Sequence, residues 1–225
     1  MNVKSFDRPS YHAINEARLA HLASLKLPLE NKTVLEVGAG IGDLTHFFEQ
    51  RGCSVLSTEG RRENVVEFRR RWPLRKIEQV DLNEEGSHTR FGTFDIVFCY
   101  GTLYHVPRPL LVLQDLAHVC KGMLLLSTRV HSTDNGEPNL IERKIQVCDQ
   151  GLYEVECVPA RNWIFEQLRE LFPCVYSTTT QPQHVNFPLE WPATTYSRAV
   201  FVASHEFLAS PFLVDHLLKE QTHGT

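Results

Sequence analysis

Three glycines at alternate positions follow an apolar run and could hold a ligand against the main chain. Gly38, Gly40 and Gly42 come directly after residues 34–37, which read Val-Leu-Glu-Val. Glycine permits a tight turn and lets a ligand approach the backbone closely, and open α/β sheets bind ligands at the carboxyl ends of their strands. The spacing therefore favours a nucleotide-type ligand over a tight turn that binds nothing.

Acidic residues at later strand ends could recognise such a ligand. Glu59 and Asp81 each follow a predicted strand, and an ionised carboxylate can accept hydrogen bonds from both hydroxyls of a ribose. Asp43 stands where the dinucleotide fingerprint G-x-G-x-x-G requires its third glycine. Its charge would oppose a pyrophosphate at the helix N-terminus, so a nicotinamide dinucleotide is disfavoured. Asp81 could instead be an ordinary turn residue.

Two histidines could supply a general base near neutral pH, because the ordinary pKa of histidine is about 6.5. His105 follows the strand predicted at residues 94–99 and would lie near the ligand. Its alternative role is to hydrogen-bond a backbone carbonyl and shape the wall of the site. His184 lies in a polar and aromatic loop that suits recognition of a second substrate. Nearby prolines also fit a plain surface loop there.

These residues need a sheet whose strand ends converge, and the periodicity predicts one. Short β-rich runs alternate with helical spacing, such as Leu44, Phe47 and Phe48 at i, i+3 and i+4. This rhythm predicts an α/β fold with a mainly parallel sheet. Strands are predicted at residues 33–37, 53–58, 75–80, 94–99, 122–127, 174–178 and 198–203, with an N-terminal helix around Leu19 and a closing helix at 213–218.

The ordered motifs resemble those of the class I S-adenosylmethionine-dependent methyltransferases over residues 33–128, a little under half of the chain. That family's first motif, an acidic residue followed by G-x-G-x-G, is matched by Glu36 and the three glycines. Its F-D-x-[IV] strand and x-x-H-[VI]-x-x-P stretch are matched at residues 94–97 and 103–109. The resemblance implies a Rossmann-like, seven-stranded, mostly parallel sheet with helices on both faces and one antiparallel late strand. Residues 59–64 also share a short pattern with the FkbM-type O-methyltransferases.

The resemblance implies S-adenosyl-L-methionine as cofactor and S-adenosyl-L-homocysteine as product. The glycine loop would wrap the methionine part of the cofactor, and Glu36 would face its amino group unless it caps the following helix. Glu59 would bind the ribose hydroxyls, and Asp81 would face the adenine amino group. The cofactor-binding residues that the resemblance implies are Glu36, Gly38, Gly40, Gly42, Glu59, Gly60, Arg61, Asp81, Leu82 and Tyr100.

The resemblance also implies methyl transfer to a small-molecule acceptor, and we expect the acceptor atom to be oxygen. The enzyme must align the acceptor with the methyl group, and removing the proton of an alcohol or phenol contributes roughly 10²–10⁴-fold. His105 and His184 are the candidate catalytic residues, no metal is expected, and the candidate acceptor-binding residues are Tyr11, Tyr104, Arg129 and His184. The alternatives are a methyltransferase that modifies a protein or RNA and a non-catalytic cofactor-binding protein.

Composition narrows the expected partners. The chain has 225 residues and a formal net charge of −4, which gives no general basic footprint for nucleic acid. No apolar run approaches the ~20 residues of a membrane helix, and no secretory signal is recognised. We expect a cytoplasmic monomer or homodimer with one domain, residues 1–225. Within it we expect a helical cap (1–32), a cofactor-binding core (33–128), and a region of late strands, acceptor-site loops and a C-terminal helix (129–225).

Overall fold

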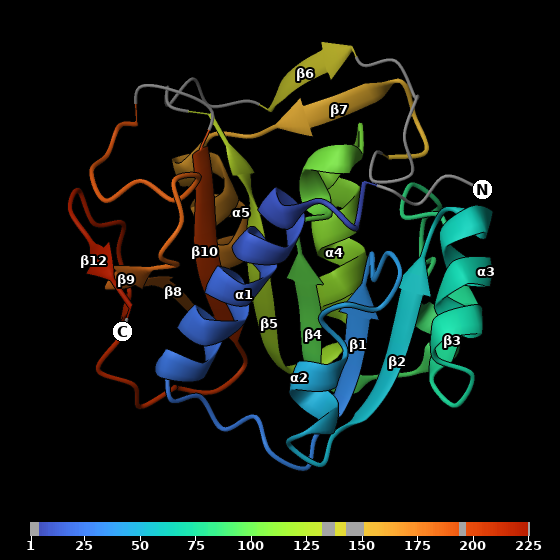
Figure 1. The fold of residues 1–225 in the computed structure, drawn as a ribbon. Helices are drawn as coiled ribbons and strands as arrows, with labels where there is room; N and C mark the ends of the chain where they lie inside the picture. The colour runs from blue at the N-terminus through green and yellow to red at the C-terminus, as the bar shows by residue number, and fades with distance from the viewer. Residues whose placement is uncertain (1–4, 132–137, 143–150, 194–196, 225) are drawn as a thin grey trace.

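The computed structural model describes residues 5–131, 138–142, 151–193 and 197–224, and its centre is one large sheet (Figure 1). The parallel strands are β1 (Thr33–Val37), β2 (Ser54–Glu59), β3 (Lys76–Gln79), β4 (Phe94–Tyr100) and β5 (Cys120–Val130). The late strands are β8 (Cys174–Thr178), β10 (Ser197–Ser204) and β11 (Leu213–Val214). Their order in the sheet is β11-β8-β10-β5-β4-β1-β2-β3, and β10 is antiparallel to both β5 and β8.

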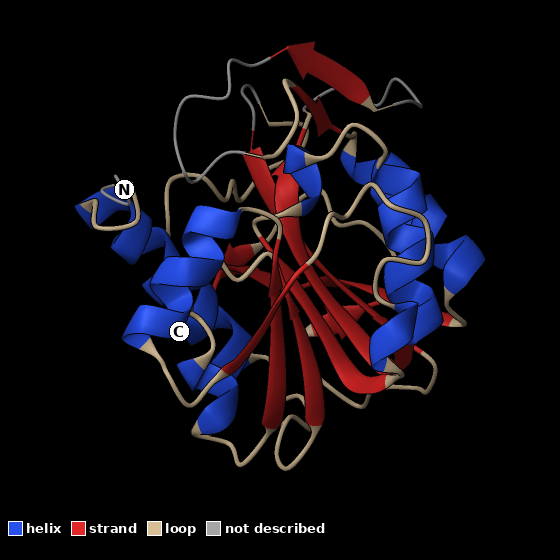
Figure 2. Cartoon of the chain, turned by 90° about the vertical axis from the view of Figure 1, so that its right-hand side faces the viewer, coloured by secondary structure: helices blue, strands red, loops and turns tan. Residues whose placement is uncertain are grey.

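Helices cover both faces of the sheet (Figure 2). Along β4, the buried side chains of Val97 and Cys99 join an apolar cluster with helices α4 and α5, while those of Ile96 and Phe98 join a second cluster with α1 and α2. A parallel strand that is buried on both faces needs apolar residues at successive positions. The helices are α1 (Pro9–Ser24), α2 (His46–Glu49), α3 (Arg62–Arg71), α4 (Pro109–Val119) and α5 (Arg161–Leu171), with 3-10 turns η1 (Thr89–Phe91) and η2 (Leu103–His105).

Local sequence signals explain where two of the helices begin and end. Proline lacks the backbone N–H that the first turn of a helix leaves unbonded, and α4 begins at Pro109. The next turns of α4 bury Val112, Leu113 and Leu116 against the sheet. Helix α3 buries Val65 and Phe68, and it ends shortly before a proline that cannot continue it.

The predicted α/β fold with a mainly parallel sheet is confirmed, with one strand more than the seven expected. The predicted closing helix at residues 213–218 is wrong, because Leu213 and Val214 form β11 and pair antiparallel with β8. Leucines at 213 and 217 have helical spacing, but the edge of β8 offers unpaired main-chain groups, and Leu213 buries its side chain there. The described residues from 205 to 224 contain no helix.

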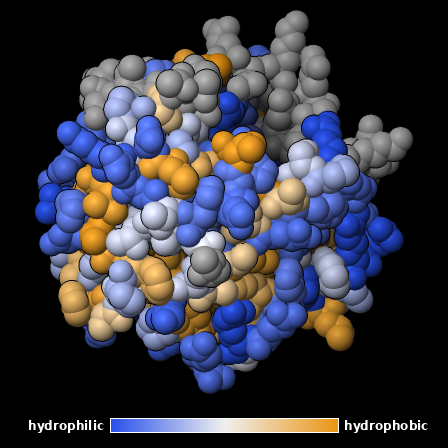
Figure 3. Space-filling model, turned by 60° about the vertical axis from the view of Figure 1, so that its left-hand side comes forward, coloured by the Kyte–Doolittle hydropathy of each residue, from blue (hydrophilic) through white to orange (hydrophobic). Residues whose placement is uncertain are grey.

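Two small sheets lie outside the main one. Strand β6 (Asn139–Glu142) pairs antiparallel with β7 (Val155–Val158), and β9 (Thr180–Gln181) pairs in parallel with β12 (Thr222–His223). The face turned forward in Figure 3 is mostly hydrophilic, with apolar side chains in separate groups. None of the described helices is both long and apolar enough to cross a membrane. In open α/β sheets of this kind, ligands bind at the carboxyl ends of the parallel strands.

Candidate active site

A cavity of about 230 Å³ lies at the carboxyl ends of β1, β2, β3 and β4. Helix α1, residues 151–153 and Arg198 of β10 complete its lining. Parallel strands bring their carboxyl ends to one edge of a sheet, so residues far apart in sequence meet here. This large cavity collects most of the site residues expected from sequence: Tyr11, Glu36, Gly38, Gly40, Glu59, Gly60, Arg61, Asp81, Leu82, Tyr100, Tyr104 and His105.

The glycine turn after β1 is held close to the segment after β4. Gly38 has a φ of +69°, and a Cβ placed there would lie 2.2 Å from Oγ1 of Thr102. That threonine hydroxyl donates a 3.1 Å hydrogen bond to the carbonyl of Val37. Gly42 (φ +89°) does not line the cavity, and a Cβ there would lie 2.6 Å from the ring of Phe68. Gly42 therefore permits packing against α3 rather than contact with a ligand.

Glu59 joins the glycine turn to the start of α3. Its Oε2 accepts a hydrogen bond of 2.9 Å from the N–H of Gly40, and its Oε1 accepts one of 2.9 Å from the N–H of Arg61. Asn64 Nδ2 also donates to Oε1, at 3.3 Å. Burial raises the pKa of Glu59 above its ordinary value, although these hydrogen bonds oppose the shift. Each carboxylate oxygen has two acceptor sites, so Glu59 can shape the turn and still accept one more hydrogen bond, at Oε2, from a ligand.

Glu36 is fully buried beneath the turn. Its Oε2 accepts hydrogen bonds of 2.7 Å from the hydroxyls of Thr45 and Ser57, while its Oε1 has no partner among the described residues. The carboxylate therefore bonds side-chain hydroxyls, and no backbone amide of the following helix bonds it in the described structure. Burial raises the pKa of Glu36 to about 7. One oxygen of this group is left available for a donor.

Residues 151–153 border the far end of the large cavity, and no sequence pattern indicated them. The hydroxyl of Tyr153 donates to Oδ2 of Asp81, whose Oδ1 accepts the N–H of Asn83 at 2.9 Å. Arg61 Nη2 donates a 2.6 Å hydrogen bond to the carbonyl of Gly151. Asp81 is therefore both a turn residue and a cavity residue, and Tyr153 contacts the carboxylate that was expected to face adenine.

The side of the cavity formed by α1 and β10 carries two arginines that sequence reasoning missed. Arg18 is 4% exposed, and only its Nη1 is bonded, to Asn15 Oδ1 at 3.0 Å. Its Nε and Nη2 have no hydrogen-bond partner among the described residues. Arg198 donates from Nη2 to the hydroxyl of Tyr104 at 3.1 Å, and its Nη1 is likewise unbonded. Two cationic groups with unused donors therefore face the same space.

His105 is paired with an acid that sequence reasoning also missed. Its Nδ1 lies 2.7 Å from Oε1 of Glu156, a residue of β7, and its ring lies 4.0 Å from that of Tyr104, centroid to centroid. Burial acts to lower the pKa of His105, but Tyr104 and Glu156 outweigh burial and raise the pKa above its ordinary value. The imidazole therefore lines the cavity with its orientation fixed by a carboxylate.

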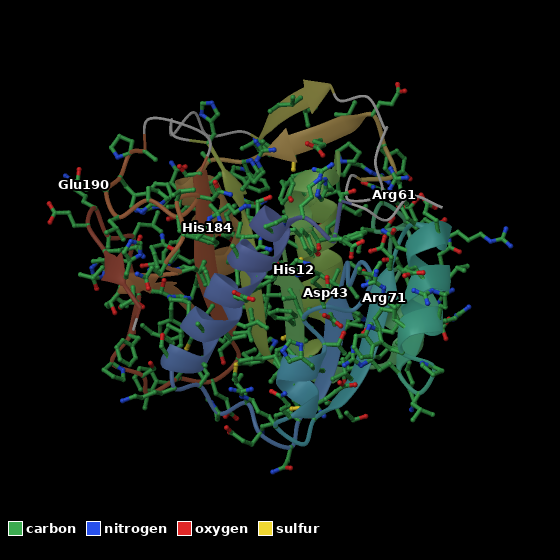
Figure 4. The ribbon with its side chains drawn as sticks, viewed as in Figure 1. His12, Asp43, Arg61, Arg71, His184 and Glu190 are labelled. Atoms are coloured by element: carbon green, nitrogen blue, oxygen red, sulfur yellow. The ribbon has the colours of Figure 1, made fainter. Side chains whose placement is uncertain are left out.

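Two candidate acceptor residues lie outside the lining of the large cavity. His184 borders a separate hollow with Val185, Phe187 and His223, and its Nδ1 accepts a 3.2 Å hydrogen bond from a backbone N–H nearby. Figure 4 shows His184 beside β10, on the left of α1, and Arg61 to the right of α1, near α3. The guanidinium of Arg129 lies 5.5 Å from the ring centre of Tyr104. The expected contacts of His184 and Arg129 with an acceptor thus stay predictions without support from the cavity.

Comparison with known proteins identifies related sequences. A family model described as a methyltransferase domain matches residues 11–187. A ubiquinone biosynthesis O-methyltransferase of Xanthomonas campestris pv. campestris is 34% identical over 123 residues, which cover 52% of this chain and 51% of the relative. The chain thus aligns with about half the length of the curated relatives it matches.

Solved structures share the fold. The N-terminal domain of EvdMO1, with S-adenosylhomocysteine bound, has a TM-score of 0.67 and 23% identity, and the match covers 86% of this chain and 81% of that one. Magnesium protoporphyrin IX methyltransferase from Synechocystis PCC 6803, with bound S-adenosylmethionine, has a TM-score of 0.57 and 16% identity, and the match covers 91% of this chain and 84% of that one. At these identities the likeness shows the fold alone.

The family model covers well over half of the chain, so the chain belongs to the methyltransferase domain family. The S-adenosylmethionine-dependent class that the motifs resemble is thereby confirmed, together with the Rossmann-like fold of that class.

Proposed function

We propose that the chain transfers a methyl group from S-adenosylmethionine to an oxygen atom of a small-molecule acceptor. The observation that carries this proposal is the large cavity, where strand-end carboxylates and a glycine turn face a histidine that is paired with Glu156. The names of the O-methyltransferase relatives support oxygen as the acceptor atom.

The unbonded groups of the cavity fit the cofactor. Arg18 Nε and Nη2 would bind its carboxylate, and Glu36 Oε1 would accept a hydrogen bond from its amino group, directly or through water. Glu59 Oε2 would accept a hydrogen bond from a ribose hydroxyl. Asp81 would accept one from the adenine amino group once Tyr153 moves aside. Gly38 and Gly40 allow the backbone to approach the methionine part. When bound, the cofactor supplies an electrophilic methyl group on a sulfonium.

His105 would act as the general base. An ionised Glu156 can only accept hydrogen bonds, so His105 Nδ1 donates to it and Nε2 is left to take a proton from the acceptor hydroxyl. As the O–H bond breaks, the acceptor oxygen forms a bond to the methyl carbon. The S–CH₃ bond breaks with its electron pair on sulfur, which leaves S-adenosylhomocysteine. Glu156 stabilises the imidazolium until its proton passes to solvent.

A labelling experiment tests the proposed function. The protein is incubated with S-adenosylmethionine that carries labelled methyl, together with a cell extract separated into small molecules, RNA and protein. We expect label in the small-molecule fraction. The labelled methyl group should resist alkaline hydrolysis, as the methyl group of an ether does. Label in the RNA or protein fraction, or label on nitrogen, would contradict the proposal. Protein with Glu59→Gln is the matched control and should transfer less label.

A further inference from the structure

The part of the large cavity between α1 and β10 carries positive charge that no described carboxylate neutralises. Arg18 and Arg198 both line it, and in the described parts of the chain neither forms an ion pair. Burial first, and then the neighbouring Arg198, lower the pKa of Arg18 to about 10. The same two arginines, after burial, lower the pKa of His184. Buried charges in proteins are normally paired, so this region is suited to anionic groups.

The cofactor accounts for one of the two arginines. Its single carboxylate belongs near the glycine turn, and Arg18 lies on that side of the region. A Cβ on Gly101 would lie 3.1 Å from Arg18 Nη2, and Gly101 directly precedes Thr102, which packs on Gly38. With Arg18 assigned in this way, Arg198 remains with an unbonded Nη1. Arg198 can therefore donate a hydrogen bond to a second anion.

Arg198 and Tyr104 together present two neighbouring hydrogen-bond donors. Arg198 Nη2 donates to the hydroxyl oxygen of Tyr104 at 3.1 Å, which leaves the hydroxyl proton free to point elsewhere. The guanidinium carbon lies 4.8 Å from the centre of the Tyr104 ring, so the ring also fixes its position. Arg198 Nη1 and the Tyr104 hydroxyl can then donate to the two oxygens of one carboxylate. The hydrogen bond from the arginine would be charge-assisted and therefore stronger than one between neutral groups.

We propose that the methyl acceptor is a hydroxy acid whose carboxylate is bound by Arg198 and Tyr104. The Tyr104 ring contacts the ring of His105 at 4.0 Å between centroids, so the anchored acid would lie beside the proposed base. Its hydroxyl could then reach His105 Nε2. The nearby walls are Tyr11, Ile14 and Tyr100, which suit an aromatic body between the two groups. This inference rests on the proposed function and adds the chemical class of its substrate.

Matched acids and amides test the assignment. Protein saturated with S-adenosylhomocysteine is titrated with benzoate, 4-hydroxybenzoate and 3,4-dihydroxybenzoate, and with the primary amide of each. An amide keeps the shape but loses the charge, so we expect the acids to bind at least about tenfold more tightly, the range for hydrogen bonds between charged groups. Arg198→Gln should reduce this preference to within about threefold. Tyr104→Phe should reduce it by a smaller factor because it removes one donor.

The controls separate this inference from the function on which it rests. Arg62→Gln changes an exposed arginine of α3 and should keep the full preference for acids. Arg198→Gln should bind S-adenosylhomocysteine as the unchanged protein does, which shows that it is folded. Equal binding of acids and amides, no binding of any acid at millimolar concentration, or an acid preference that survives Arg198→Gln would overturn the inference alone. Failure of the unchanged protein to bind S-adenosylhomocysteine would instead overturn the proposed function.

Discussion

The two halves of the large cavity differ in charge and in the way the chain builds them. The half proposed to hold the cofactor, called the cofactor half, carries Glu36, Glu59 and Asp81, each at or just after the end of one of three successive strands. The half proposed to hold the acceptor, called the acceptor half, carries Arg198 of a late strand, and Arg18 of the first helix lies between the two halves. One half is therefore acidic and local in sequence, while the other is cationic and depends on the completed fold.

The pKa values of Glu36 and Glu59 in the cofactor half are shifted in the opposite direction to that of Tyr104 in the acceptor half. In the cofactor half, burial raises the pKa of Glu36 to about 7 and raises that of Glu59. In the acceptor half, burial acts to raise the pKa of Tyr104, but Arg198, His105 and Arg18 outweigh it and bring the pKa to about 7. The carboxylates of the cofactor half therefore suit a ligand with hydrogen-bond donors. The arginine of the acceptor half suits an anionic ligand. Three substitutions test whether the halves act separately.

The largest expected effect is on catalysis, in the acceptor half. His105→Gln should lower kcat by about 10²-fold or more, because it removes the proposed base, while the affinity for S-adenosylhomocysteine stays nearly unchanged. In the unchanged protein, activity should rise with pH through the pKa of His105, which lies above 6.5, because only the neutral imidazole accepts a proton. The pH–rate profile of both proteins is the measurement.

His118→Gln provides the control for this profile. His118 is an exposed residue of α4 outside the large cavity, and its replacement should leave the profile as it is. If His105→Gln keeps both the rate and the same loss of activity at low pH, His105 is a wall residue, as one interpretation of the sequence allowed. The acceptor would then need no base from this position.

A smaller effect is expected on stability, in the cofactor half. Gly38→Ala adds a Cβ within 2.2 Å of Thr102 at a φ of +69°, so we expect the free energy of unfolding to fall by about 2–4 kcal/mol. Gly86→Ala has a similar φ of +65° but only ordinary contacts, at 3.5 Å, and should cost about 1–2 kcal/mol. Chemical denaturation of the three proteins gives the comparison. An equal fall in the free energy of unfolding for both variants would show that the close approach of Gly38 to Thr102 does not affect stability.

The smallest effect concerns the adenine end of the cofactor half. Tyr153 donates to Asp81 Oδ2, and it must release that oxygen if the carboxylate is to face adenine. Tyr153→Phe should therefore tighten the binding of S-adenosylhomocysteine by a few-fold, within the ~0.5–1.5 kcal/mol of a typical hydrogen bond. Titration calorimetry can resolve a change of this size. Weaker binding would instead make Tyr153 a part of the cofactor site.

The cofactor half could be predicted from sequence because its chemistry follows local rules. A glycine turn after a strand and an acid after the next two strands lie within one stretch of chain, and the parallel sheet brings their ends together. The family resemblance implied ten cofactor residues, and Gly42 is the one that does not line the cavity, because it packs on Phe68. The spacing of glycines shows where a Cβ is excluded, but not whether a ligand or a side chain excludes it.

The acceptor half could not be predicted in the same way. Arg18 lies on a helix and Arg198 on a strand, and neither belongs to a motif that indicates an approach between them. Glu156 meets His105 only because β7 lies beside η2. His184 was expected in the cavity from the polarity of its loop, but it borders a separate hollow. Its role toward an acceptor stays a prediction.

The binding of S-adenosylhomocysteine to three proteins tests most directly the claim that the cavity has two separate halves. Titration calorimetry is carried out on the unchanged protein, on Glu59→Gln and on Arg198→Gln. The account predicts binding to the unchanged protein, affinity weakened by about tenfold or more in Glu59→Gln because a hydrogen bond to a charged group is lost, and unchanged affinity in Arg198→Gln. Equal weakening by both substitutions, or no weakening by Glu59→Gln, would contradict it.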